Sequence, residues 1–210
     1  MKRLVIGVLA LIGSTGICST AFGVITGSDH DFSGSNWSSG QICLPCHAPH
    51  NGTVIADAPL WNHDVSEASY TLYSSATLDA DDLSQPAGVS KLCLSCHDGT
   101  VAIDAFTGHD GTIFIGTIGT GSGDLGSALN NDHPVSFTYD SALATADGGL
   151  WDPSSKSSGI TEGGTIDSDM LFAGRMECAS CHDVHNKYEN TSLLLIDNDG
   201  SNLCLTCHNK

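Results

Sequence analysis

Basic residues are scarce in this sequence of 210 residues. Seven Lys and Arg stand against 24 Asp and Glu, and the formal net charge is −17. Nucleic acids and anionic membrane surfaces attract proteins through clusters of Lys and Arg, so we expect no nucleic-acid partner and no binding to such membranes. The acidity suits cationic partners, metal ions or mineral surfaces, and it also helps to keep an exported protein soluble.

Long apolar runs are also missing. The most pronounced one, residues 4–12, follows Lys2 and Arg3, and it is too short for a membrane span, which takes about 20 residues. A basic start, an apolar stretch and small residues before position 24 are typical of a secretory signal peptide. We therefore expect residues 1–23 to be cleaved, and the mature protein, residues 24–210, to be exported without a transmembrane segment.

Runs with helical spacing are rare as well, and Gly, Ser, Thr, Asp and Asn dominate the sequence. On composition alone a well-packed core is doubtful. We expect a mostly irregular chain with a few short α-helices and short β-strands. One strand is predicted within residues 112–119, where β-branched and aromatic residues are interrupted by glycine.

What the sequence does contain is a five-residue pattern, Cys-x-x-Cys-His, four times over, at 43–47, 93–97, 178–182 and 204–208. The pattern is typical of a c-type haem attachment site. Two thiols at this spacing can bond both vinyl groups on one porphyrin edge, and the adjacent histidine can then bind the iron. A zinc site, a redox dithiol or a disulfide framework would also use such cysteines. None of these requires a histidine after every second cysteine, so four covalent haem c groups are predicted.

The motifs assign a role to each of their cysteines and histidines. A ninth cysteine, Cys18, lies in the leader. Four porphyrins bring the apolar surface that the composition lacks, so we expect the haems to form the core and the apoprotein to be largely unfolded. The predicted thioether residues are Cys43, Cys46, Cys93, Cys96, Cys178, Cys181, Cys204 and Cys207, and the predicted proximal iron ligands are His47, His97, His182 and His208.

Each iron also needs a ligand on its second face. Methionine is scarce, with only Met170 and Met176 after the leader, whereas six histidines lie outside the motifs. Bis-histidine coordination is therefore predicted for all four irons, and with it low reduction potentials. The six candidates are His30, His50, His63, His109, His133 and His185.

An internal repeat suggests how these histidines are used. Each half reads His-x-x-Ser, then a haem motif with a histidine three residues beyond it, then a second haem motif. Two tandem haem-pair modules, roughly 24–110 and 125–210, explain this order, and we expect them to stack as one continuous domain. Within these modules His30 is expected to serve the first haem, His50 the second, His133 the third and His185 the fourth, with His63 as the alternative to His30 and His109 as a bystander.

His30 has a further possibility, because it lies close to the expected mature N-terminus, where chains are mobile unless tied down. A ligand on such an arm can reach a haem in a neighbouring subunit, and His63 could do the same. A contact of this kind that repeats head to tail without closing a ring builds a filament.

The order of these motifs resembles that of the multihaem cytochromes c with doubled haem motifs. It reads H-x-F-S, C-x-x-C-H-x-P-H, P-L-W-N and C-x-x-C-H, then H-P-V-S-F, C-x-x-C-H-x-x-H and C-x-x-C-H. Size, haem number and acidity are similar to those of tetrahaem outer-surface cytochromes that polymerise into conducting filaments. The resemblance implies closely stacked haems running through the polymer, with one bis-histidine pair shared between subunits. It transfers distal roles to His30, His50, His133 and His185.

The predicted function is electron transfer without substrate chemistry, so the protein is not expected to be an enzyme. Its expected partners are further copies of itself, other c-type cytochromes as donors, and extracellular metal oxides or electrodes as acceptors. The expected location is extracellular or at the cell surface, with the periplasm as the alternative. Two rival functions are a soluble periplasmic tetrahaem carrier and a multihaem reductase, which would need a five-coordinate iron.

Overall fold

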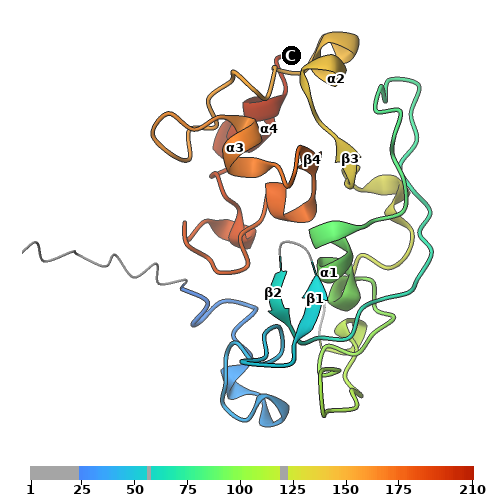
Figure 1. Cartoon of the computed structure of the whole chain (residues 1–210), viewed down its shortest axis with the longest axis vertical. Coiled ribbons are helices and arrows are strands. Elements are labelled where there is room, and N and C mark those ends of the chain that lie inside the picture. Colours follow the sequence, from blue (N-terminus) through green and yellow to red (C-terminus); the bar gives the residue numbers. More distant parts are fainter. Residues whose placement is uncertain (1–23, 56–57, 119–122) are drawn as a thin grey trace, which may run out of the picture.

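A computed structural model describes residues 24–55, 58–118 and 123–210. The predicted signal peptide, residues 1–23, lies outside the described part of the chain. Figure 1 shows the N-terminal residues at one end of the longest axis, α1 near the centre, and α2, α4 and the C-terminus at the other end. Most of the described chain is irregular, as the composition predicted. Within it, no helix has the length and apolar character needed to cross a membrane.

The regular elements are short. Within the described ranges the strands pair antiparallel, β1 with β2 and β3 with β4. The α-helices of this part of the chain are α1 (Gly88–His97), α2 (Ser141–Asp147), α3 (Ile166–Met170) and α4 (Asn202–Cys207). The strands are β1 (Thr53–Ile55), β2 (Ala58–Trp61), β3 (Phe137–Thr138) and β4 (Arg175–Met176), and the 3-10 turns include η3 (Ile115–Thr117) and η5 (Cys178–Ser180).

Local capping explains why two of these helices form in a chain of weak helical propensity. The Asp140 carboxylate accepts a hydrogen bond from the Leu143 N–H at the start of α2, and Gly148 ends that helix in the left-handed conformation. At the start of α3, the side chains and backbone of Thr165 and Ser168 cap each other reciprocally. Such caps replace the helical hydrogen bonds that a short helix cannot make.

The C-terminal half contains an apolar protein core, which the composition did not predict. Its fully buried members include Tyr139, Ile166 and Met170, which come from the β3 region and from α3. Cys207 on α4 belongs to the same cluster. The polypeptide therefore contributes a core of its own beside the last haem motif, and this half does not depend on porphyrin surface alone for apolar packing.

The strand predicted within residues 112–119 is wrong for the described residues 112–118. These residues form an irregular segment that ends in the 3-10 turn η3. At its start, the backbone N–H groups of Thr112 and Ile113 donate hydrogen bonds to the buried Asp104 carboxylate, each at 2.8 Å. The Ile113 carbonyl accepts from Ile103. Because the Asp104 side chain satisfies the two amides and the Ile103 N–H satisfies the carbonyl, these backbone groups need no partner strand.

The segment that links the two halves of the sequence packs on the first half. The Leu125 N–H donates to the His97 carbonyl at 2.7 Å, and the Thr71 N–H donates to the Ser127 carbonyl at 2.9 Å. Leu129 is buried against Leu94 of α1. Residues 125–129 therefore contact the element that carries the second haem motif.

Candidate haem centres

Each Cys-x-x-Cys-His motif forms one turn of helix. The motif at 93–97 closes α1, the motif at 204–208 closes α4, the third begins with η5, and the first is an isolated turn. Residues three apart lie on one face of such a turn, so the two thiols of a motif point to the same side. The closing hydrogen bonds from the histidine N–H to the first cysteine carbonyl measure 2.8 Å for His47 and Cys43, 3.1 Å for His182 and Cys178, and 2.9 Å for His208 and Cys204.

The first motif is held in place by the β1–β2 hairpin. The Asn62 side chain donates to the Leu44 carbonyl at 2.6 Å. The Ala48 N–H donates to Leu60 at 2.9 Å, and the Asn62 N–H donates to Cys46 at 3.0 Å. These hydrogen bonds hold the motif within the turn and directly after it. The first motif therefore has a fixed orientation although it belongs to no helix.

The cysteines of successive motifs lie close enough to interact electrostatically. Burial raises the pKa of Cys96 to about 12, with a further contribution from Cys46. The four motifs therefore follow one another in space in the order of the sequence. The neighbouring thiols are Cys46 with Cys96, Cys93 with Cys178, and Cys181 with Cys207.

Three of the four proximal histidines face a second imidazole. Two imidazoles that bind one metal ion from opposite sides have ring centres about 6 Å apart, since each metal–nitrogen bond is about 2 Å long. The observed separations match this value. The ring centres are 5.9 Å apart for His30 and His97, 6.3 Å for His47 and His185, and 6.4 Å for His133 and His208.

Hydrogen bonds select the ring nitrogen that is available to a metal. A backbone carbonyl only accepts hydrogen bonds, so a ring Nδ1 that meets one carries the proton and leaves Nε2 with its lone pair. His97 makes this bond to Gly123 at 2.8 Å, and His182 makes it to Ser192 at 2.9 Å. The distal candidate His133 makes it to Pro134 at 2.9 Å. All three therefore present Nε2 as a ligand.

His30 is kept neutral by its surroundings. Burial, together with the neighbouring His97, lowers its pKa to about 4. Its Nδ1 is buried and has no hydrogen-bond partner. Because only the neutral imidazole binds a metal, these features fit a ligand better than a surface histidine.

The partners differ from those predicted from the repeat. The repeat assigned His30 to the first haem, whereas its ring faces His97 of the second motif. Likewise, His133 faces the fourth motif rather than the third, and His185 faces the first rather than the fourth. In the loop that carries His185, the Asp183 carboxylate accepts hydrogen bonds from the His185 and Lys187 amides at 2.9 Å, and it lies 3.5 Å from the His185 ring Nδ1.

His63, the alternative to His30, is buried beside the second haem motif, and both of its ring nitrogens have partners. Its Nδ1 lies 2.6 Å from the Asp64 carbonyl, and its Nε2 lies 3.0 Å from the Ala102 carbonyl and 3.4 Å from the Cys96 sulfur. His109 bonds the Asp104 carbonyl at 2.6 Å and stacks on Phe106. Neither ring faces a motif histidine in a ring pair, so His30 is the better distal candidate.

The third motif is different. Within the described residues no second imidazole forms a ring pair with His182. The fourth distal candidate, His50, is exposed, and its Nδ1 accepts a hydrogen bond from the Asn51 side chain at 3.1 Å. The structure therefore does not bring His50 together with a motif histidine of the same chain.

Sequence reasoning missed a buried carboxylate next to the second motif. Asp98, which directly follows His97, accepts hydrogen bonds from the side chains of Ser66 at 2.5 Å and Tyr70 at 2.6 Å. Thr100 donates to its other oxygen from both backbone and side chain. The sequence indicates this site only by an aspartate directly after a motif. The donors to its carboxylate from residues 66–70 are identified only in the folded structure.

A comparison with protein families matches residues 171–210 to the family described as "Doubled CXXCH motif". This segment contains the third and fourth motifs. A search of curated proteins gives no match. Together with the two further copies at 43–47 and 93–97, the family match supports a multihaem c-type cytochrome that binds haem covalently.

Proposed function

We propose that the protein is an electron-transfer cytochrome with four bis-histidine haem c groups. The observation that carries this proposal is the set of three imidazole pairs with ring centres 5.9–6.4 Å apart, each containing one motif histidine. When bound, each haem iron exchanges single electrons between its ferrous and ferric states. The residues fix the spacing of the four centres and occupy the coordination positions at which small molecules would bind.

The expected pairs are His97 with His30, His47 with His185, and His208 with His133. The neighbouring thiols of successive motifs support closely spaced centres in the order of the sequence. Such an arrangement favours transfer through the molecule over chemistry at one open iron, and other c-type cytochromes are the proposed donors.

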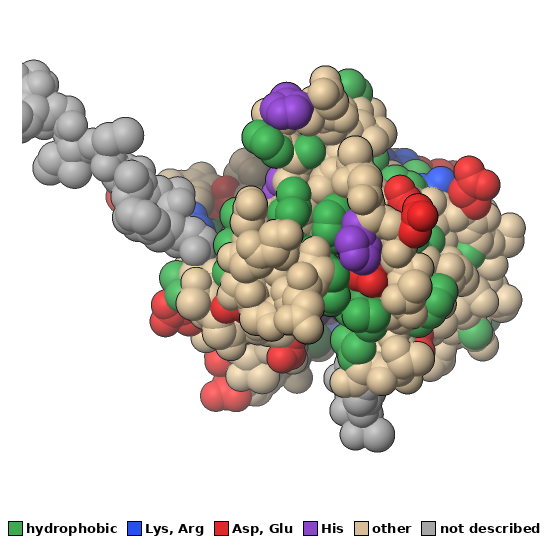
Figure 2. All heavy atoms as spheres, turned by 90° about the horizontal axis from the view of Figure 1, so that it is seen from below, with side chains coloured by type: hydrophobic (Ala, Val, Ile, Leu, Met, Phe, Trp, Pro, Cys, Tyr) green, Lys and Arg blue, Asp and Glu red, His purple; other side chains and the backbone are tan. Residues whose placement is uncertain are grey.

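We further propose that the protein polymerises head to tail into an extracellular filament that delivers electrons to metal oxides or electrodes. Within the described part of the chain no second imidazole forms a ring pair with His182, and His50 is exposed. His50 of a neighbouring copy would supply the second ligand of the iron at the third motif. In Figure 2, histidine side chains lie at the surface of the end that holds the N-terminal residues, beside hydrophobic side chains, which suits such a contact. Val54, in the hairpin after His50, is 99 % exposed and adds apolar surface for it.

The test compares native protein with His50→Ala, using His109→Ala as the matched control. Mass spectrometry should find four haems in all three proteins. Electron microscopy should show filaments for the native protein and the control, and discrete particles for His50→Ala. Electron paramagnetic resonance should then report one high-spin haem in four for His50→Ala only.

Other outcomes select the rival functions. Discrete native particles at all concentrations, with every haem low-spin, would indicate a soluble carrier. A strong high-spin signal in the native protein would indicate a reductase with an open iron at His182. A mass without added porphyrin would end the proposal altogether.

A further inference from the structure

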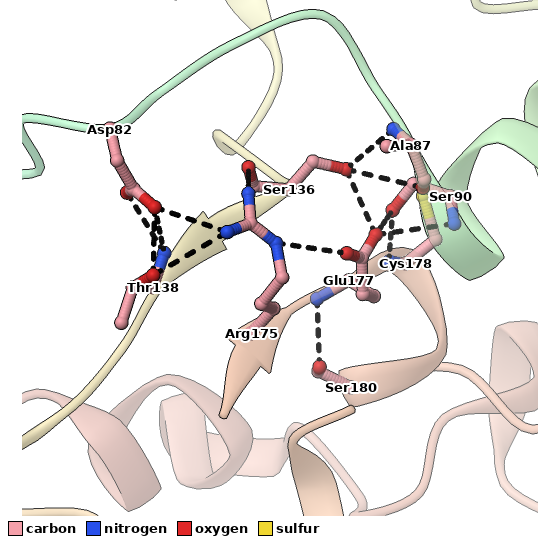
Figure 3. Close-up of polar contacts among 9 residues, drawn as sticks. All are labelled: Asp82, Ala87, Ser90, Ser136, Thr138, Arg175, Glu177, Cys178 and Ser180. Atoms are coloured by element: carbon pink, nitrogen blue, oxygen red, sulfur yellow. Dashed lines mark hydrogen bonds and ion pairs between the residues drawn. The ribbon is translucent and has the colours of Figure 1, made fainter. Parts of the chain in front are cut away.

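A buried polar cluster joins the second haem motif to the third. Figure 3 shows it between α1, β3, β4 and η5, with Glu177 at its centre. The Glu177 side chain is only 3 % exposed. Charged side chains are rarely buried to this degree without a reason, because removing a carboxylate from water is costly.

The donors converge on one oxygen of this carboxylate. Oε2 accepts hydrogen bonds from the Ser90 backbone N–H at 3.2 Å, from the Ser90 hydroxyl, and from the Ser136 hydroxyl at 2.9 Å. Its position is further fixed by the Ser180 hydroxyl, which accepts from the Glu177 N–H at 2.9 Å. An ionised carboxylate only accepts hydrogen bonds, so the geometry of these three donors matches it.

Positive charge compensates Glu177 only in part. The Arg175 Nε lies 3.8 Å from Glu177 Oε1, while its Nη1 lies 3.1 Å from the Asp82 carboxylate. Arg175 also donates to the Ser136 carbonyl. It is the only arginine after the leader, and it is shared between two carboxylates. The cluster therefore keeps a net negative charge.

This charge lies next to two haem attachment sites. Glu177 immediately precedes Cys178, and its main donor, Ser90, is one helical turn before Cys93. The Cys178 N–H donates to the Ser90 hydroxyl at 2.9 Å, which links both sites directly. A hydrogen bond with Cys178 raises the pKa of the Cys93 thiol, so the two sulfur atoms are neighbours.

Resting on the proposed electron-transfer function, we propose that Glu177 sets the reduction potentials of the second and third haems. Its buried negative charge favours the ferric state of both irons and lowers their potentials relative to the first and fourth haems. Neutral hydrogen-bonding groups would be sufficient if the cluster only held the second and third motifs together. A fixed charge shared by two attachment sites gives Glu177 an electrostatic role at the point where electrons cross between the two halves of the molecule.

The test is Glu177→Gln in the full haem-loaded protein, with the exposed Glu162→Gln as the control for the same loss of charge. Spectroelectrochemical titration at pH 7 should move two of the four haems to higher potential. At their native midpoint, the ratio of reduced to oxidised haem should rise about tenfold, the size expected for losing one nearby buried unit charge at an effective dielectric constant of about 20. The control should leave all four potentials unchanged.

A second variant should shift the reduction potentials in the opposite direction. Arg175→Gln removes the partial compensation, so the same two haems should move to lower potential. This variant tests the inference even if Glu177→Gln does not fold. Two well-folded variants that leave all potentials unchanged, or that shift all four haems equally, would overturn the role of Glu177.

The proposed function is read out separately in the same samples. Four attached haems by mass spectrometry and low-spin spectra would leave it intact whatever the potentials do. Missing haems in the native protein would remove the proposed function and the inference together.

Discussion

At the scale of single residues, the histidines are distinguished by which ring nitrogen remains available. His133 bonds one carbonyl through Nδ1, whereas both nitrogens of His63 lie against carbonyls. The sequence identified the six histidines outside the motifs as candidates and could not separate these two cases. The choice depends on carbonyls of the folded chain, such as that of Ala102, which lies far from His63 in the sequence.

The pair of His133 and His208 gives the first prediction at this scale. His133→Ala should leave four haems attached, because the thioether bonds do not involve it, and should convert one haem from low-spin to high-spin. Electron paramagnetic resonance and the visible spectrum measure the change. Substituting His109, which stacks on Phe106, should leave the low-spin spectrum unaltered. An unchanged spectrum for His133→Ala would remove this residue from the ligand set.

Asp98 gives a prediction for pH dependence. Burial raises the pKa of this carboxyl, but hydrogen bonds from Ser66, Tyr70 and Thr100 outweigh burial and bring the pKa below its ordinary value of 3.8. Since the folded pKa is the lower one, the stabilisation is complete above about pH 4 and is lost as the pH falls through the folded value.

Asp98→Asn should therefore cost about 1–3 kcal/mol in the free energy of unfolding at pH 7. The difference from the native protein should shrink below about pH 4. Urea unfolding of the haem-loaded protein at several pH values measures both effects, with the exposed Asp110→Asn as control. A difference that stays constant down to pH 2 would contradict the role given to the carboxylate.

At the scale of elements, the helical turn of each haem motif follows directly from local sequence. Cysteines three residues apart must share a face to reach one porphyrin edge, and the turns at 93–97 and 204–208 do close helices. The strand expected within 112–119 failed because its propensity for β-structure was outweighed by Asp104, whose carboxylate takes the amides that a neighbouring strand would have used.

The β1–β2 hairpin depends on a close approach at Gly52. A Cβ atom there would lie 2.6 Å from the backbone of Leu60, so Gly52→Ala should cost about 1–3 kcal/mol. Because Leu60 also accepts from the Ala48 N–H next to His47, the substitution should loosen the first haem motif as well. Chemical unfolding measures the loss of stability.

Gly34 is the matched control for this prediction. No heavy atom lies within 4 Å of a Cβ built there, so Gly34→Ala should stay within about 0.5 kcal/mol of the native protein. Equal stability of the two variants would mean that the hairpin accommodates the methyl group.

At the scale of the whole molecule, one pair of facing histidines crosses the boundary between the two sequence modules. The repeat shows which residues recur in the sequence, and it suggested that each module serves its own haems. Instead His185, in the second module, faces His47 in the first. A repeat records local similarity, whereas the partner of a ring depends on how loops such as the one held by Asp183 turn.

The pairing of His185 with His47 predicts which segment of the chain is destabilised when a distal histidine is removed. His185→Ala should increase hydrogen exchange around residues 41–63, which surround His47, and leave residues 199–210 protected. His133→Ala should do the reverse, because its ring faces His208. Hydrogen-exchange mass spectrometry of the two haem-loaded variants makes the comparison. Increased exchange at 199–210 in His185→Ala would restore the pairing expected from the repeat.

The distance along the chain between His47 and His185 also has a consequence for biogenesis. On the proposed export, His47 crosses the membrane long before His185, the residue that faces it. A newly translocated chain therefore holds its first prosthetic group with one side uncovered until His185 has crossed. Contacts between such remote positions form late, so this early intermediate is the stage at which a foreign ligand would most easily intrude.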